Sequence, residues 1–120
     1  MTISGQNFEV YQGDNKEIII TVRDDNENII DLTGYSVVWC VHNQRVTDII
    51  FQKTTSLGEE ITIPNPTSGE IIITLEGLDT HILTPKNYGH QCEIQDQFGN
   101  HATVTTGYMK ILKSITHHVL

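Results

Sequence analysis

Apolar and polar side chains alternate along most of this chain, or form short runs of Ile and Val, between turn-forming residues spaced roughly every ten positions. A period of two places successive side chains on opposite faces of a β-strand, whereas a helix requires a period near 3.6. The alternation therefore predicts strands and almost no helix. The predicted strands are Phe8–Tyr11, Glu17–Arg23, Ser36–Asn43, Ile49–Thr54, Glu60–Ile63, Glu70–Leu75, Tyr88–Gln95 and Ala102–Leu112.

The segments between these strands carry the residues that turns need. Gly, Asn, Asp, Ser and Pro tolerate left-handed backbone or cap a turn with a side chain. They gather at 13–15, 24–28, 64–69 and 97–100. Residues Leu78–Leu83 differ, because their apolar spacing predicts one short connector helix, which crosses one end of the fold and ends before Pro85.

The pattern as a whole predicts an all-β fold, an immunoglobulin-like β-sandwich of about eight mostly antiparallel strands with one short connector helix. A length of 120 residues suits a single domain with its own core, so 1–120 is expected to form one unit. The two ends lack the alternation, and we expect flexible tails at 1–6 and 114–120.

The alternation also predicts which side chains face the core. In the strand Tyr88–Gln95 the inward set is Tyr88, His90, Cys92 and Ile94. The strand Ser36–Asn43 is apolar on both faces, which indicates either a central strand or a strand whose outer face a partner covers. Trp39 in this strand is predicted to fill the core in preference to forming a sugar-stacking platform. Tyr88 and Tyr108 are predicted to lie in the core as well.

Charge and hydropathy narrow the classes of partner. The net charge of −8 repels a polyphosphate backbone and argues against nucleic-acid binding. No apolar stretch has the length of a membrane span and none resembles a secretion signal, so we expect a soluble protein made in the cytoplasm. Cys40 and Cys92 fit either one disulfide in an oxidising compartment or two reduced thiols in the cytosol.

Four residues have the composition of a zinc site. Cys40 and His42 are two positions apart, as are His90 and Cys92, and Cys2His2 is a common tetrahedral ligand set. Strand parity argues against the site. If Trp39 faces the core, Cys40 and His42 face away from it, whereas His90 and Cys92 face inward. Ordinary half-buried strand residues are the favoured interpretation.

The segment Asp24–Asp31 places oxygen ligands at alternate positions, like the start of a calcium loop. Ile29 stands where that loop needs Gly, however, and Tyr35 where it needs Glu, so a polar hairpin turn is favoured. His117 and His118 form an exposed pair near the C-terminus, and they too predict no metal site. We expect no metal and no cofactor.

Nothing in the chain has the spacing of a catalytic site. The sequence contains no glycine-flanked nucleophile, and its glycines stand singly, not in a phosphate-binding loop. The acidic residues lie mostly in turns, where nothing raises the pKa of a carboxyl group. We therefore expect a protein that is not an enzyme, with no catalytic or cofactor-binding residue, and that acts by binding.

Three stretches in order carry a resemblance to a known family. They are Phe8–Asp14 with the following strand Ile18–Asp24, then Ile30–Val37, then Pro66–Ile73. The later pieces keep the same order, from Leu75–Leu83 through Pro85–Tyr88 and Phe98–Asn100 to Thr103–Ile111. Over nearly its whole length the chain resembles the N-terminal domain of the upper baseplate protein of phages of Gram-positive bacteria and its prophage relatives.

The resemblance implies a structural protein of a phage or prophage virion, either a baseplate or tail component or an adaptor or decoration subunit. It implies contacts with other virion proteins, a homo-oligomer, and location in the virion. The alternative that the residues leave open is a carbohydrate-binding β-sandwich module for host surface glycans. No nucleic-acid or membrane partner is expected.

Overall fold

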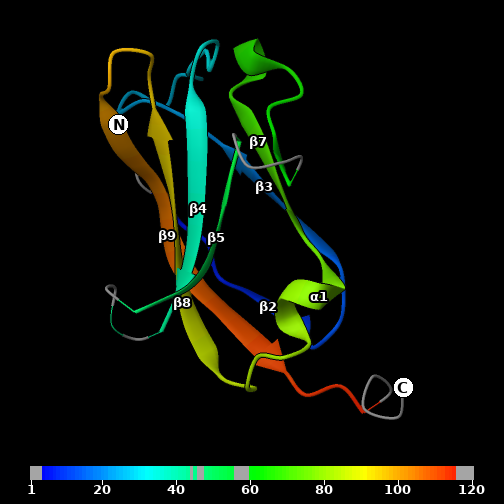
Figure 1. Ribbon diagram of the computed structural model, residues 1–120. Helices are drawn as coiled ribbons and strands as arrows, with labels where there is room; N and C mark the ends of the chain where they lie inside the picture. The colour runs from blue at the N-terminus through cyan, green and yellow to red at the C-terminus, as the bar shows by residue number, and fades with distance from the viewer. Residues whose placement is uncertain (1–3, 44, 46–47, 56–59, 116–120) are drawn as a thin grey trace.

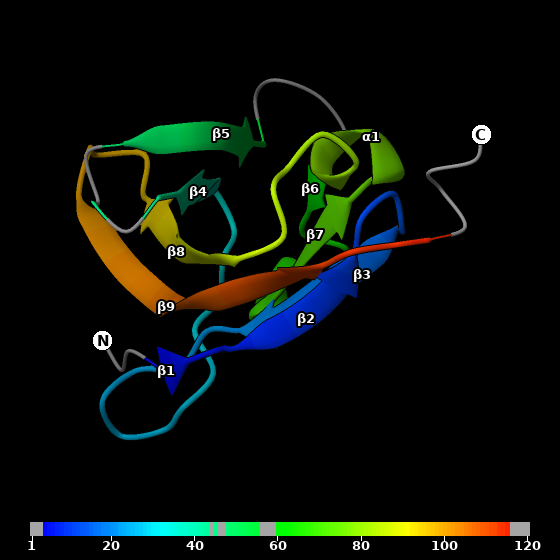
Figure 2. The ribbon, with the colours of Figure 1, turned by 90° about the horizontal axis from the view of Figure 1, so that it is seen from below.

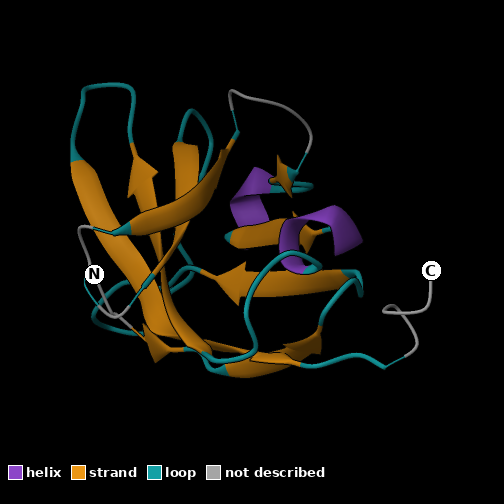
Figure 3. Ribbon diagram, turned by 60° about the horizontal axis from the view of Figure 1, so that its bottom comes forward, coloured by secondary structure: helices purple, strands orange, loops and turns teal. Residues whose placement is uncertain are grey.

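The protein folds into two β-sheets packed face to face, so the prediction of an all-β sandwich is confirmed (Figure 1). The computed structural model describes residues 4–43, 45, 48–55 and 60–115. Strands make up most of this structure and helices only short turns (Figure 3). No helix in the described part of the chain is long and apolar enough to cross a membrane.

The elements follow the chain in an order close to the predicted one. The strands in the described ranges are β1 (Ser4–Gly5), β2 (Phe8–Tyr11), β3 (Lys16–Thr21), β4 (Ser36–His42), β5 (Ile49–Thr54), β6 (Ile61–Thr62), β7 (Glu70–Leu75), β8 (Asn87–Gln95) and β9 (His101–Leu112). A 3-10 turn, η1 (Pro66–Ser68), precedes β7, and the short helix α1 (Gly77–Thr80) follows it.

The strand order is that of an immunoglobulin-like sandwich. In the larger sheet, sheet A, β1 and β2 pair with β9, followed by β8, β4 and β5. The smaller sheet, sheet B, has the order β3-β7-β6. Only β1 and β2 run parallel to their neighbour, and every other described pair is antiparallel. Figure 2 shows the two sheets from below, with α1 next to sheet B.

All eight predicted strands are present, with small shifts at their ends. The predicted strand Glu60–Ile63 shortens to Ile61–Thr62. Ser4 and Gly5 form β1, although a flexible tail was expected over 1–6. Two residues are too few to show alternation, and this strand exists because β9 offers it a paired edge.

The connector helix is present but shorter than Leu78–Leu83. It covers Gly77–Thr80, and His81 to Leu83 form a turn. A capping box fixes its start, because the backbone N–H of Glu76 donates to Asp79 Oδ2 at 2.7 Å and the Glu76 side chain accepts from the backbone of Asp79. Figure 1 shows this helix at the lower end of the sandwich.

The core lies between the sheets and is mostly aliphatic around one tryptophan. Its fully buried side chains include Trp39, Leu32, Ile71, Ile73, Leu75, Ile94, Met109 and Ile111. The inward set predicted for β8 is confirmed, because all four side chains are buried. Strand β4 is central in its sheet, between β8 and β5, with Val37, Trp39 and Val41 buried in the core and Val38 and Cys40 half-buried on the outer face.

Lys53 places a charge inside this core. The side chain is only 2% exposed, and its Nζ lies 2.8 Å from Glu60 Oε2 and 2.9 Å from Asp79 Oδ2. Burial lowers the pKa of Lys53, but the hydrogen bonds to the two carboxylates raise it further, so the net shift is upward and the amine stays charged. The ion pairs join β5 of sheet A to α1 and to the start of β6 in sheet B.

Candidate functional site

The four candidate zinc ligands do not converge. Cys40 and His42 lie half-buried on the outer face of sheet A, whereas His90 and Cys92 are buried on the inner face with Trp39. The predicted parity is therefore confirmed. No group of three or more His, Cys, Asp or Glu side chains within the described ranges could hold a metal ion. His117 and His118 lie outside these ranges.

The two cysteines are free thiols on opposite faces of one sheet, which prevents a disulfide between them in this fold. Burial raises the pKa of Cys92 to about 12, and burial also raises the pKa of the half-buried Cys40. Neither sulfur is thereby activated as a nucleophile, because nucleophilic attack needs the thiolate.

The carboxylates of the calcium-like segment serve as turn caps. Asp24 Oδ1 accepts the backbone N–H groups of Asn26 and Asn28, both at 2.9 Å. These hydrogen bonds, foremost the one from Asn28, lower the pKa of Asp24. Asp31 in turn accepts the backbone N–H and the hydroxyl of Thr33. The favoured interpretation, a polar hairpin turn, describes this geometry.

A chain of hydrogen bonds runs through the core from Trp39 to the N-terminal segment. The indole Nε1–H of Trp39 donates to His90 Nδ1 at 3.2 Å, and His90 Nε2 lies 2.6 Å from the carbonyl oxygen of Gln6. Because Nδ1 is the acceptor for Trp39, the ring proton must sit on Nε2, which then donates to Gln6. The rings of Phe8 and Trp39 flank that of His90 at 5.3 and 5.8 Å between centroids.

The close approach of Gln6 depends on a glycine opposite it. Gly107 lies across from His90 in the β8–β9 ladder, and a Cβ atom there would lie 1.9 Å from the Gln6 carbonyl oxygen. Any larger residue would push the N-terminal segment off β9. The position thus fixes β1 against β9 and holds the acceptor of His90 in place.

Tyr108 is not in the core, contrary to the sequence prediction. The side chain is 63% exposed, because the parity that buries Met109 and Ile111 turns Tyr108 to the outer face of sheet A. It stands opposite Gly89, over which the ring of His42 lies closely packed. This places a phenol beside an imidazole on the outer face of sheet A.

Two shallow depressions flank Tyr108 on this outer face, and we call them the Tyr108 groove. The larger, of about 610 Å³, is lined by His42, Asn43, Asn87, Gly89, His90, Gln91, Thr106, Gly107 and Tyr108. The smaller, of about 290 Å³, is lined by Asn7, Phe8, Glu9, Asn87, Tyr108 and Lys110. The amides of Asn43, Asn87 and Gln91 in the larger depression can both donate and accept hydrogen bonds.

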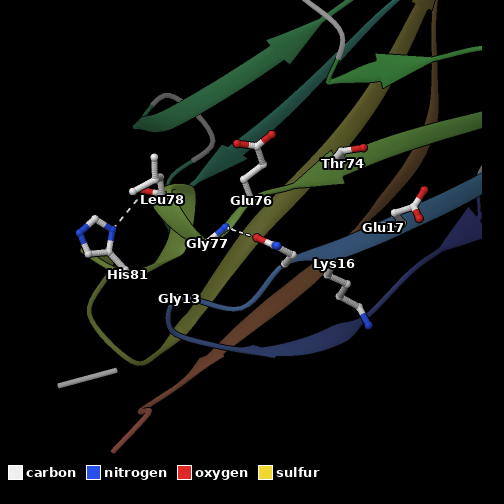
Figure 4. Close-up of a pocket in the computed structure, with 9 residues that line it drawn as sticks. Gly13, Lys16, Glu17, Thr74, Glu76, Gly77, Leu78 and His81 are labelled. Atoms are coloured by element: carbon white, nitrogen blue, oxygen red, sulfur yellow. Dashed lines mark hydrogen bonds between the residues drawn. The ribbon is translucent and has the colours of Figure 1, made fainter. Parts of the chain in front are cut away.

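A third depression, of about 950 Å³, lies between the β2–β3 turn and α1 (Figure 4). Its lining combines the polar start of β3 with the helix, where Asn15 Oδ1 accepts the Gly77 N–H at 2.6 Å. Leu78 lines it and is 77% exposed, and Ile82, four residues on, is 76% exposed. We call Leu78 and Ile82 the α1 patch.

The depression beside α1 is lined by Lys16, Glu17, Glu76 and His81 as well as by Leu78. No protein-family model matches the chain, and no curated protein matches it. The surface at α1 combines one exposed apolar side chain with charged ones, and the surface at Tyr108 is polar and aromatic.

We expect the stability of the protein to fall on mild acidification because of His90. Burial, first, and the neighbouring His42 lower the pKa of His90, while the hydrogen bond to Gln6 partly opposes this shift. A lowered folded pKa means that the contribution is complete above the unfolded value of about 6.5 and is lost as the pH falls below it. The loss cannot exceed about 1.4 kcal/mol for each pH unit.

Urea unfolding between pH 7.5 and 5 measures this effect against His90→Gln, which does not titrate. The wild type should lose more unfolding free energy over this range than the variant. Parallel curves for the two proteins would show that His90 titrates alike in the folded and unfolded chains, contrary to the buried hydrogen-bond chain.

Proposed function

We propose that this chain is a structural protein of a phage or prophage virion that works through contacts with other virion proteins. The observation that carries the binding role is the α1 patch, in which Leu78 and Ile82 are 77% and 76% exposed at one end of the sandwich. Leu78 lines the depression beside α1, and an exposed apolar side chain at such a depression is typical of protein-binding surfaces.

The phage assignment rests on the sequence resemblance to upper baseplate proteins. That resemblance runs through turn and core positions, including the 3-10 turn and Gly69 before β7, whose left-handed backbone (φ 67°) suits glycine. We assign the chain to the baseplate, the tail or an adaptor or decoration layer, with its location in the virion. The proposal gives it no catalytic role.

The α1 patch should be the part of the surface on which virion binding depends. Replacing Leu78 and Ile82 with Asp puts charges where a partner would bury apolar groups, and we expect binding to weaken by at least about 100-fold. Pull-down of the neighbouring virion proteins from a phage lysate, followed by titration of the purified partner, measures the loss.

Phe98→Asp is the matched control, because Phe98 is 80% exposed but lies in the β8–β9 turn. It should bind as the wild type does. Equal affinity of the double variant and the wild type would rule out the α1 patch as the contact surface.

Glycan binding is the second candidate, and the Tyr108 groove favours it. A sugar ring stacks on an exposed aromatic face while amide groups hydrogen-bond its hydroxyls. Tyr108 supplies the ring, and Asn87 lines both depressions beside it. Trp39 cannot serve as the platform, since its side chain is fully buried.

Tyr108→Ala tests this candidate on an array of bacterial surface glycans. If the groove binds sugar, the variant should lose binding by about tenfold or more, whereas Tyr11→Ala, which removes a tyrosine that is 52% exposed elsewhere, should retain it. Absence of any glycan signal for the wild-type protein would remove this candidate.

A further inference from the structure

Strand β3 forms an edge of sheet B. In the described part of the chain its only strand partner is β7, which pairs with it from Lys16–Leu75 to Thr21–Glu70 without a bulge (Figure 1). The other side of an edge strand presents backbone N–H and C=O groups that can pair with another strand. The structure shows which residues present them.

Two hydrogen bonds fix the direction of every backbone group in β3. The Val22 N–H donates to the Gly69 carbonyl at 2.8 Å, so even-numbered residues of β3 bond to β7 and odd-numbered ones point away. Independently, the Thr74 N–H donates to the Glu60 carbonyl at 2.7 Å, on the far side of β7. Since Thr74 stands opposite Glu17, the groups of Glu17 also point away from β7.

The outward set is therefore Glu17, Ile19 and Thr21. The side chain of Ile19 is 53% exposed on the outer face of sheet B, next to Ile72 of β7. Natural edge strands avoid such a surface with proline, a bulge or an inward charge. The charged residues Lys16 and Glu17 lie only at the start of β3, and the stretch from 18 to 21 has none of these devices, so its outward backbone groups are available to pair with another strand.

We propose that a second copy of this chain covers it, with the two β3 strands pairing antiparallel about a two-fold axis at Ile19. Ile19 then faces Ile19 of the second copy, and Glu17 faces Thr21 of the second copy. This deepens the proposed assembly role, because it names a partner and the strand that binds it. The two three-stranded sheets become one continuous sheet.

The register follows from the outward groups and from charge. Centred on Ile19, the pairing engages all three outward residues of both copies and makes about six backbone hydrogen bonds. Centred on Glu17, it would set two like-charged carboxylates opposite one another, which is destabilising. A two-fold axis at Ile18 or Ile20 would leave one of the outward residues opposite a position that lies outside β3 of the second copy.

Side-chain packing supports the same register. Ile19 and Ile72 are paired neighbours on the outer face of sheet B. The two-fold axis would bring Ile19 and Ile72 of both copies into one row of four isoleucines across the joined sheet. Each exposed Ile19 thereby gains an apolar neighbour. An isologous contact of this kind closes at two copies.

Cysteine crosslinking tests the register directly. In a Cys40→Ser background, Ile19→Cys should crosslink with itself on oxidation, because residues directly opposite in such a pair have Cα atoms about 5.5 Å apart. Glu17→Cys and Thr21→Cys should each stay uncrosslinked alone but form a mixed dimer when combined. Light scattering of the wild-type chain should give twice the mass of one chain.

A charge at the axis supplies the second test. Ile19→Lys places two ammonium groups opposite one another and should raise the dimer dissociation constant at least about tenfold. Phe98→Lys, a matched change at a site that is 80% exposed, should leave the dimer intact. Circular dichroism of both variants confirms that the sheets are retained.

A wild-type chain that is monomeric at every soluble concentration overturns the inference, as does a dimer in which only Glu17→Cys crosslinks with itself. So does a dimer that Ile19→Lys leaves unchanged, or an edge occupied by a different virion protein. A monomer that still binds virion proteins through the α1 patch leaves the proposed function standing. A dimer formed at β3 by a chain that binds no virion protein supports the β3 pairing and overturns the proposed function.

Discussion

The hydrogen bond from His90 Nε2 to the Gln6 carbonyl is the contact on which the strand arrangement depends. It holds the N-terminal segment against β9, where Gly107 leaves room for it, and so commits β1 and β2 to sheet A. In sandwiches whose first strand pairs with the second, that strand covers the edge of the other sheet. In this protein β3 forms that edge of sheet B, and its outward backbone groups are therefore available for association.

A second buried polar contact, at Lys53, stabilises the opposite side of the sandwich. Its ion pairs with Glu60 and Asp79 join the edge strand β5 to the connector helix. Because Glu60 and Asp79 keep 44% and 22% of their side chains exposed, these ion pairs are only partly removed from water, and they hold the helix next to β5. The helix that Lys53 anchors carries Leu78, which gives the α1 patch a defined place on the surface.

Alternation in the sequence was enough to predict the strands, the inward face of β8 and the separation of Cys40 and His42 from His90 and Cys92. These depend only on the period of two within one strand. Alternation did not locate Lys53, because an inward lysine looks unfavourable until the fold brings two distant carboxylates to it. The sequence did not reveal the short β1 for a similar reason, since its pairing depends on β9, which lies near the other end of the chain.

Tyr108 shows how a residue type can mislead where its neighbours do not. Tyr108 was predicted to lie in the core, but the burial of Met109 at the next position requires Tyr108 to face outward. The alternation in β9, like that in β8, separates inward from outward side chains and puts Tyr108 in the outward set. The α1 patch had a weaker signal, because Leu78 and Ile82 belong to a segment too short to show which face is buried.

Nitrogen-15 NMR of the His90 side chain at neutral pH, assigned by comparison with His90→Gln, tests the central hydrogen-bond chain most directly. The structure requires a neutral ring with its proton on Nε2 and an unprotonated Nδ1 that accepts from Trp39. A ring protonated on Nδ1, or on both nitrogens, would contradict this arrangement and the attachment of the N-terminal segment that follows from it.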